Sequence, residues 1–299
     1  MVNPEPNDSG SFPFDRQWSI EQALPLACLL EAAAPKLGNV HPQAMFEDMH
    51  FGHFLASALC LPSQQHLEEQ GVGSWVELAV QAVQSHVGIN TNLGTLLLLG
   101  PLAKAAASTS DIEVISWQES VHSTLEQLTP DDSRCVYSAI RNSSAGGLNE
   151  QSAGDVHGEA PDDLLEAMQR VAGFDAVARQ YVNGFTDVFE RLLPWFLQAL
   201  RERQQGSAQS IPASLAAIVD LQVRWLATEP DGLIVRKEGA EVAGKVQQLA
   251  VEAMNSAAAR VELEDYLIGD GNRRNPGTTA DLIAATLFVA LVLGPVAVS

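Results

Sequence analysis

The chain has 299 residues, of which 46% are hydrophobic and only 6% aromatic. It contains 37 Asp plus Glu residues but only 17 Lys plus Arg residues. This length is ample for a sizeable core, and the composition favours packed helices over a β-sandwich rich in Val, Thr and Tyr. The formal net charge of -20 repels polyanions and argues against general nucleic-acid binding, although a local anion site stays open.

The chain is expected to form a flexible segment followed by one all-α domain. Residues 1–17 are polar and lack periodicity, which predicts a flexible N-terminal lead-in. No later stretch has the composition of a linker, so residues 18–299 are expected to form a single large multi-helix domain. No alternating strand pattern exceeds four residues, and we expect ten to twelve helices.

Capping patterns and apolar periodicity predict a succession of helices along the chain. Ser19, with Gln22 three residues later, forms a capping-box pattern that predicts a helix through Leu30. Periodic apolar residues predict further helices over 47–61, from 74, from 96, from 116, over 131–141, over 162–200 with breaks at Gly173 and Pro194, over 212–226 and over 240–267.

The last segment, 282–298, is apolar and uncharged. It is slightly short for a membrane span and no Lys or Arg follows it, so a buried core helix is favoured over a tail anchor. No basic stretch precedes an apolar run near the N-terminus, so no secretory signal is predicted and a cytoplasmic location is expected. Cys28, Cys60 and Cys135 are odd in number and widely spaced, which favours buried free thiols over disulfides or a metal site.

Three loop-to-helix junctions are dense in polar groups: 35–41, 88–94 and 275–281. We expect them to form the walls of one polar cleft. Since helix N-termini favour anions, this cleft would suit an anionic ligand. In the last junction, Gly277 lets the backbone approach a ligand. Thr278 and Thr279 either bind phosphate there or simply cap the following helix.

Acidic and histidine side chains gather between Glu47 and His53. On a helix, Glu47 and His50, and with them His53, would share a face compatible with metal ligation, although a solvated helix start explains the same pattern. For Mg²⁺ bound to phosphates one or two carboxylates suffice, so Asp48 with Asp155 or Asp281 would be adequate. Asp155 lies in the long loop 143–161, which is either functional or disordered.

Basic residues are few, and two of the four lysines, Lys36 and Lys237, occupy short glycine-containing turns. They are candidates for anion binding, with exposed turn lysines as the alternative. Arg141 ends a predicted helix just before the long loop. Asp175 and Arg179 are four residues apart, which predicts an intrahelical ion pair.

No P-loop, Gly-x-Gly-x-x-Gly, Gly-x-Ser-x-Gly or Cys-x-x-Cys motif occurs, so several common enzyme classes lack support. Taken in order, the polar junctions resemble the triphosphoribosyl-dephospho-CoA synthase family. The resemblance rests on these segments: 35–41, 47–49, 54–57, 88–94, 136–141, 146–148, 155–156, 237–239 and 275–281. Two positions depart from the family pattern, namely Leu37 in place of Pro and Asn92 in place of His. With its segments 38–41 and 46–48, the chain resembles a divergent branch of the family that is associated with tetrahydromethanopterin one-carbon metabolism.

The resemblance implies an enzyme that moves the 5-triphosphoribosyl group of ATP to the 2′-hydroxyl of 3′-dephospho-CoA and releases adenine. Such a transfer passes through an oxocarbenium-like state. It implies Asp281, Asp155 and Asp48 as catalytic carboxylates, with Asp281 or Asp155 as the base, and Mg²⁺ held by Glu47, Asp48 and Asp155. It also implies nucleotide contacts from Lys36, Asn39, His41, Asn90, Thr91, Asn92, Gly94, Arg141, Lys237, Asn275, Gly277, Thr278 and Thr279.

ATP and dephospho-CoA or a related acceptor are thus the expected partners, without nucleic acid or membrane, and a homodimer is a further expectation. Three alternatives stay open: a related ribosyl transfer in tetrahydromethanopterin-linked cofactor synthesis, a non-catalytic nucleotide-binding module, and a metal-dependent phosphohydrolase centred on 47–53.

Overall fold

The computed structural model of the chain describes residues 12–109, 112–143, 159–206 and 211–297. Within these ranges all regular structure is helical, apart from an isolated antiparallel bridge between His41 and Ala44. The elements are α1 (Ile20–Ala33), α2 (Phe51–Ala58), α3 (Gln64–His86), α4 (Leu93–Ala107), α5 (Val114–Glu126), α6 (Pro130–Asn142), α7 (Leu164–Val171), α8 (Ala176–Asn183), the π-helical turn η1 (Asp187–Leu192), α9 (Leu193–Gln205), α10 (Ala213–Thr228), α11 (Gly232–Glu238), α12 (Ala240–Ala253), α13 (Ala257–Ile268), α14 (Gly277–Leu293) and η2 (Gly294–Ala297). The prediction of a single all-α domain is confirmed.

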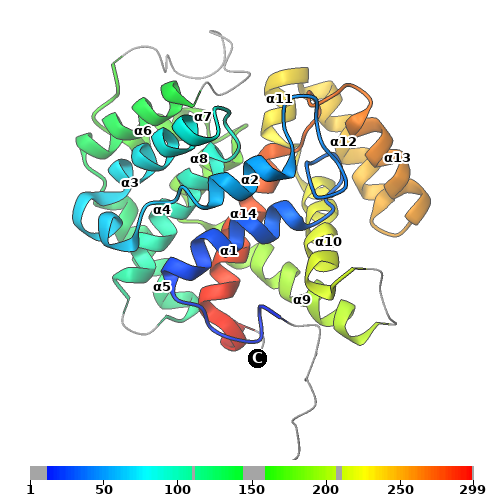
Figure 1. Cartoon of the computed structure of the whole chain (residues 1–299), viewed down its shortest axis with the longest axis horizontal. Helices are drawn as coiled ribbons and strands as arrows, with labels where there is room; N and C mark the ends of the chain where they lie inside the picture. Colours follow the sequence, from blue (N-terminus) through cyan, green and yellow to red (C-terminus); the bar gives the residue numbers. More distant parts are fainter. Residues whose placement is uncertain (1–11, 110–111, 144–158, 207–210, 298–299) are drawn as a thin grey trace, which may run out of the picture.

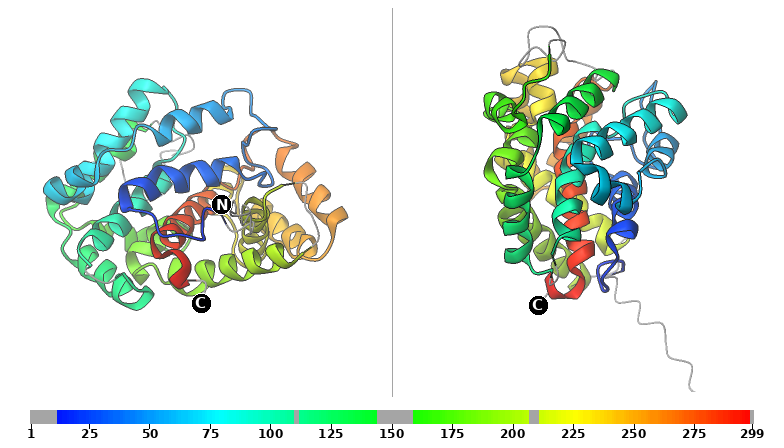
Figure 2. Two further views of the ribbon diagram at one scale, coloured as in Figure 1. Left: turned by 60° about the horizontal axis from the view of Figure 1, so that its bottom comes forward. Right: turned by 90° about the vertical axis from the view of Figure 1, so that its left-hand side faces the viewer.

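Helix α14 forms the centre of the molecule (Figure 1). It packs against α1, α4, α8, α9, α10 and η1, and Figure 2 shows it running between the N-terminal helices and the helices around α9. Every residue from Leu282 to Leu293 is buried, as expected of a helix that is apolar on all sides. The segment is therefore the predicted core helix, and no helix in the described ranges is long and apolar enough to cross a membrane.

The buried side chains form two clusters. The larger cluster joins α1–α10 and α14, whereas a smaller one is built by α10–α13 around Ile234, Val246 and Leu263. Helix α11 belongs to the smaller cluster and contacts α14 of the larger one. Helix α11 therefore meets α14 where the two clusters join.

Part of the predicted flexible lead-in is packed on the core. The Phe14 side chain is 1% exposed, and its ring lies 4.8 Å from the ring of Phe196 on α9. The indole of Trp18 donates a 2.9 Å hydrogen bond to the Pro13 carbonyl. Residues 12–17 are thus held by apolar burial, which their mixed polar composition did not indicate.

Several predicted helix ends differ from the structure, and the number of helices exceeds the expected ten to twelve. Helix α3 starts at Ser63 rather than Ser74 and is bent at Gly71, where φ is 86°. The predicted helix 240–267 is two helices, because Ser256 caps α13 with a hydrogen bond to the Ala259 N–H. In the predicted helix 162–200, the chain also breaks at Gly184, which has a φ of 64°. All three cysteines are free thiols as predicted, although only Cys28 is buried.

Candidate active site

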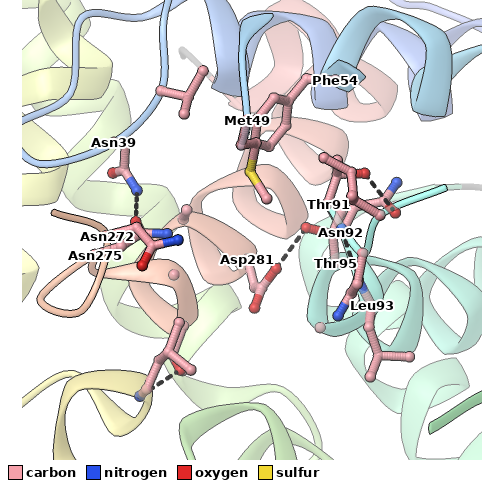
Figure 3. A pocket seen from close by; sticks show the side chains of 18 of the residues that line it. Asn39, Met49, Phe54, Thr91, Asn92, Leu93, Thr95, Asn272, Asn275 and Asp281 are labelled. Atoms are coloured by element: carbon pink, nitrogen blue, oxygen red, sulfur yellow. Dashed lines mark hydrogen bonds between the residues drawn. The ribbon is translucent and has the colours of Figure 1, made fainter. Parts of the chain in front are cut away.

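A cavity of about 420 Å³ lies where α1, α2, α4, α8, α11 and α14 meet. Residues of all three predicted polar junctions line it. Figure 3 shows Asp281 near its middle, with Asn39, Asn272 and Asn275 on one side, Thr91 and Thr95 on the other, and Met49 and Phe54 above. The lining combines amide, hydroxyl and charged groups with apolar faces, as is common where small molecules bind.

Asp281 lies just after the first turn of α14 and faces the first turn of α4. Its Oδ1 accepts a 2.8 Å hydrogen bond from the Thr95 hydroxyl. Burial raises the pKa of the Asp281 carboxyl to about 8, although hydrogen bonds from Thr95 act in the opposite direction. The negative charges of Glu31 and Asp231 raise this pKa further. A carboxyl group with such a pKa is suited to proton transfer near neutral pH.

Gly94 permits this approach of α14 to α4. A Cβ atom at position 94 would lie 2.5 Å from Cγ of Asp281 and closer still to Oδ2. The missing side chain therefore allows the carboxyl group to lie directly against the first turn of α4. Gly94 thus shapes the site through close packing, and this packing alone explains why glycine suits the position.

Asp231 connects the starts of α11 and α14. Its Oδ1 accepts hydrogen bonds from the N–H groups of Leu233 and Ile234, so it caps α11. Its Oδ2 accepts hydrogen bonds of 2.7 Å from both the N–H and the hydroxyl of Thr279. In addition, the Thr278 hydroxyl accepts a 3.1 Å hydrogen bond from the Leu233 N–H. Neither threonine caps α14, whose N-cap residue is Pro276 and has no side-chain hydrogen bond, so the capping alternative is wrong. Both threonines instead join the start of α14 to the start of α11.

Helix α11 brings two cations to the cavity, Arg236 and Lys237. Lys237 was predicted to lie in a turn, but it ends this short helix, which stops at Gly239 with a φ of 91°. Its ammonium lies 3.5 Å from the Asn272 carbonyl oxygen. Burial, and after it the charge of Arg236, lowers the pKa of Lys237, whereas Asp48 raises it.

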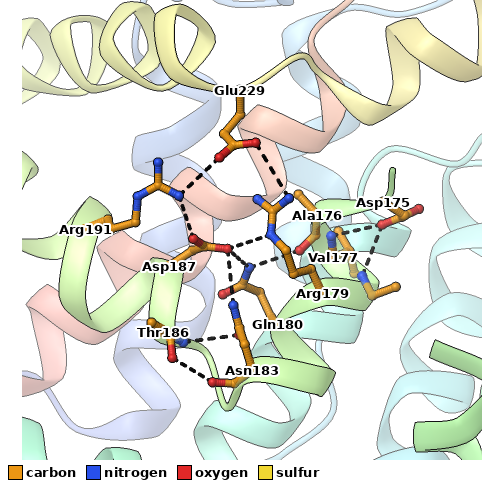
Figure 4. A network of polar contacts seen from close by, with 11 residues as sticks. Asp175, Ala176, Val177, Arg179, Gln180, Asn183, Thr186, Asp187, Arg191 and Glu229 are labelled. Atoms are coloured by element: carbon orange, nitrogen blue, oxygen red, sulfur yellow. Dashed lines mark hydrogen bonds and ion pairs between the residues drawn. The ribbon is translucent and has the colours of Figure 1, made fainter. Parts of the chain in front are cut away.

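Asp175 and Arg179 do not form the predicted intrahelical ion pair. Asp175 caps α8 through the N–H groups of Val177 and Ala178, and its Oδ2 binds Arg236 at 2.8 Å. The capping geometry points the carboxylate back along α8, away from Arg179. The Arg179 side chain instead joins Asp187 and Glu229 in a separate network (Figure 4). The prediction was wrong because it ignored the helix start at Asp175.

The loop after α1 is fixed by side-chain amides. Gln222 of α10 accepts a hydrogen bond from the Leu37 N–H and donates to the carbonyl oxygen of Leu37 and to Asn39 Oδ1. Asn39 in turn donates a 2.5 Å hydrogen bond to Asn275 Oδ1. The loops before α2 and α14 are thereby tied together beside the cavity, which gives Asn39 and Asn275 a clear structural role.

The loop before α4 also uses its own side chains. Asn90 Oδ1 accepts hydrogen bonds from the N–H groups of Asn92 and Leu93, and so caps the helix. The Thr91 hydroxyl lies 2.6 Å from that of Ser57, which connects this loop to α2. The loop is therefore held by its own hydrogen bonds, and residues of the helix N-terminus that follows it line the cavity.

The predicted histidine–acid face does not form. Glu47 and Asp48 precede α2, so they cannot share a helical face with His50 and His53. Nδ1 of His50 accepts a hydrogen bond from the Gly52 N–H, and Nδ1 of His53 accepts one from the His50 N–H. Among the described residues, no three His, Cys, Asp or Glu side chains gather as a metal site would require. The sequence pattern is explained by helix capping, and no zinc-type centre exists in this part of the chain.

Lys36 is fully buried and is absent from the lining of the cavity. Its ammonium binds the Glu31 carboxylate at 2.7 Å and the Glu31 carbonyl oxygen at 2.6 Å. Since Glu31 itself lines the cavity, Lys36 lies behind Glu31 and contacts it instead of a ligand in the cavity. The alternative of an exposed turn lysine is equally wrong.

The cavity brings together most of the predicted site residues. Those that line it are Asn39, Asp48, Asn90, Thr91, Asn92, Gly94, Lys237, Asn275, Gly277, Thr278 and Asp281. Lys36, His41, Glu47, Arg141 and Thr279 do not line it, and Asp155 lies outside the described residues. The cavity also contains polar residues that the sequence analysis missed: Glu31, Thr95, Asp175, Arg236 and Asn272. An acidic residue in the apolar last turns of α1, well beyond the first-turn Glu21, was an available signal for Glu31.

Asp48 is the predicted metal ligand whose surroundings can be compared with the needs of a magnesium ion. It lines the cavity, and its Oδ1 lies 3.5 Å from Nδ2 of Asn272, whereas Glu47 lines only a neighbouring hollow. A single carboxylate is a poor cation site by itself, but it suffices where substrate phosphates supply the other ligands of Mg²⁺. The residues present therefore fit a magnesium ion that enters with a phosphorylated substrate.

Comparison with known proteins identifies the family and a structural neighbour of this chain. The family model CitG, described as ATP:dephospho-CoA triphosphoribosyl transferase, matches residues 17–297. A crystal structure from Archaeoglobus fulgidus, described provisionally as a triphosphoribosyl-dephospho-CoA synthase, superimposes with a TM-score of 0.61 at 27% sequence identity. That match covers 80% of this chain and 99% of the archaeal chain. No curated protein matches this chain.

Proposed function

Because this chain belongs to the ATP:dephospho-CoA triphosphoribosyl transferase family and is a transferase, we propose that it moves the 5-triphosphoribosyl group of ATP to the 2′-hydroxyl of 3′-dephospho-CoA with release of adenine. The observation that carries the proposal is the position of Asp281. Its carboxyl lies in a cavity that also presents two cations and the N-termini of α4 and α14. Such a cavity suits a triphosphate at one side and proton transfer at its centre.

The triphosphate is assigned to the side formed by α11. Arg236 and Lys237 provide positive charge in a protein with a formal charge of -20, and charged hydrogen bonds to phosphate are stronger than neutral ones. Asp48 would hold Mg²⁺ together with phosphate oxygens, and that ion would supply further charge neutralisation when bound. The adenine is assigned to the apolar side chains of Phe46, Met49 and Phe54, which offer faces for a purine ring.

Asp281 is assigned as the base that accepts the proton of the attacking hydroxyl. The bond between C1 of the ribose and adenine breaks as the acceptor oxygen bonds to C1. The departing adenine takes up one proton, which balances the proton released by the acceptor. The polar lining of α4, including Thr95, holds the carboxyl group in place.

The function is tested by incubating the protein with ATP, Mg²⁺ and 3′-dephospho-CoA and measuring free adenine and the coupled product by chromatography. CoA is the matched control acceptor, since its 3′-phosphate crowds the 2′-hydroxyl. Adenine release that depends on dephospho-CoA supports the proposal. Nucleotide binding without adenine release would instead favour another acceptor or a binding module, and phosphate release would favour a phosphohydrolase.

The pH dependence of the rate tests the assignment of Asp281 as the base. A base acts in its ionised form, and burial raises the pKa of Asp281 to about 8. We expect kcat/KM to rise about tenfold per pH unit below this value and to level off above it. A rate that falls above pH 8 would show that Asp281 donates its proton as an acid instead.

Lys237→Met is expected to weaken ATP binding by about 10- to 100-fold, because a charge-assisted phosphate contact is lost. The change should leave the melting temperature nearly unchanged, since within the described residues this ammonium makes one hydrogen bond, which spans 3.5 Å. Lys245→Met is the matched control, because Lys245 is exposed on α12 and does not line the cavity. Equal ATP affinity in the two variants, measured by calorimetry, would remove Lys237 from the site.

A further inference from the structure

The buried pair of Glu31 and Lys36 is the feature of the site that the proposed reaction does not yet use. Lys36 is 0% exposed and Glu31 is 8% exposed. Taking two charges out of water is costly, and an apolar pair of similar volume commonly gives equal or greater stability. Stability alone therefore does not account for a charged pair at this position.

The two oxygens of the Glu31 carboxylate have different surroundings. Oε1 lies 2.7 Å from the Lys36 ammonium, which also donates a 2.6 Å hydrogen bond to the Glu31 carbonyl oxygen. Oε2 accepts no hydrogen bond from the residues that the structure describes. Lys36 thus fixes the side chain from behind, and Glu31 lines the same cavity as Asp281.

We propose that Glu31 is a second catalytic carboxylate, which stabilises the positive charge that develops on the transferred ribose, and that Lys36 is a positioning residue that holds it. This inference rests on the proposed function. As the bond from C1 to adenine breaks, the electron pair leaves with adenine and C1 becomes electron-poor. A fixed negative charge nearby lowers the energy of that state. The acceptor oxygen then supplies the new electron pair, and Asp281 takes its proton.

The two carboxylates have different tasks because their neighbours differ. Protonation of Glu31 would leave the buried Lys36 ammonium without a counter-charge, so Glu31 is suited to electrostatic stabilisation. Asp281 has the Thr95 hydroxyl as its hydrogen-bond partner and no cation bonded to it among the described residues, so it is suited to proton transfer. Two carboxylates in one site with unequal surroundings commonly divide the work in this way.

Three variants test the proposal: Glu31→Gln, Lys36→Met, and the double variant with both changes. Glu31→Gln is expected to lower kcat for adenine release about 100-fold or more while KM for ATP changes less than about threefold. Each single variant leaves one buried charge unpaired and should lower the melting temperature. The double variant removes both charges and should regain thermal stability, but its kcat should stay low. Recovery of kcat in the double variant to within tenfold of wild type would overturn the proposal and leave a merely structural pair.

A binding measurement separates this proposal from the proposed function. The probe is a triphosphate of a ribose-like pyrrolidine, whose protonated ring nitrogen mimics the charged ribose, compared with ribose 5-triphosphate. Wild type should prefer the cationic compound, and Glu31→Gln should lose about tenfold or more of that preference. If wild type releases no adenine, the proposed function fails, yet a preference that depends on Glu31 would keep the charge-stabilising role. Equal affinities in wild type and Glu31→Gln would overturn it.

Discussion

Replacement of Asp281 by Asn is expected to lower kcat for adenine release by about 10³-fold, because the base is lost while the shape of the side chain is kept. The Asn oxygen can still accept the hydrogen bond that the Thr95 hydroxyl donates to Asp281 Oδ1. The fold should therefore persist, and ATP affinity should change little. Single-turnover measurements of adenine release, together with calorimetric ATP binding, distinguish lost chemistry from lost binding.

The same variant is expected to be more stable than wild type at alkaline pH. Burial raises the pKa of Asp281 from 3.8 to about 8, so its contribution to stability is fully present below about pH 4 and is lost as pH rises through 8. Asn does not titrate and avoids this loss. Each pKa unit corresponds to about 1.4 kcal/mol, and since the side chain is partly accessible we expect a gain of about 2 to 4 kcal/mol at pH 8.

Urea unfolding of both proteins at pH 4.5 and pH 8 measures this difference. The free energies of unfolding should nearly agree at the lower pH and diverge at the higher one. A constant difference at both pH values would show that the Asp281 carboxyl does not titrate in this range. It would also remove the reason to expect a rate that rises up to pH 8.

Local sequence signals predicted much of the fold. Ser19 caps α1 and accepts a hydrogen bond from the Gln22 N–H as the capping pattern predicted. The final segment forms the buried helix α14, as predicted from its apolar and uncharged composition. These signals succeed because they depend on residues within one or two turns of each other.

The failures involve a helix too short to show periodicity and contacts that depend on tertiary packing. Helix α11 was missed although Asp231 and Gly239 mark its ends, because seven residues contain too few turns to show periodicity. Lys36 was assigned to the ligand, but its partner Glu31 lies one turn earlier on a face that only the packing of α1 buries. The three polar junctions were found from composition and end up around one cavity, whereas the contribution of α8 and α11 to it depends on tertiary packing.

Gly94→Ala is expected to reduce kcat about 100-fold and to destabilise the protein by about 2 kcal/mol, because the new methyl group would displace the Asp281 carboxyl. Gly244→Ala is the matched control. A Cβ at Gly244, on α12, meets no atom within 4 Å, so this change should stabilise the helix by about 0.5 to 1 kcal/mol.

A double-mutant cycle shows whether the cost at position 94 comes from Asp281. In an Asp281→Ala background the carboxyl is absent, so Gly94→Ala should no longer destabilise and should resemble the control at position 244. The free energy of unfolding of the four proteins gives the coupling between the two positions. A similar loss in both backgrounds would place the obstruction in the backbone of α4 rather than at the carboxyl. A strong coupling would instead mean that Gly94 is present because α14 must bring Asp281 against the start of α4.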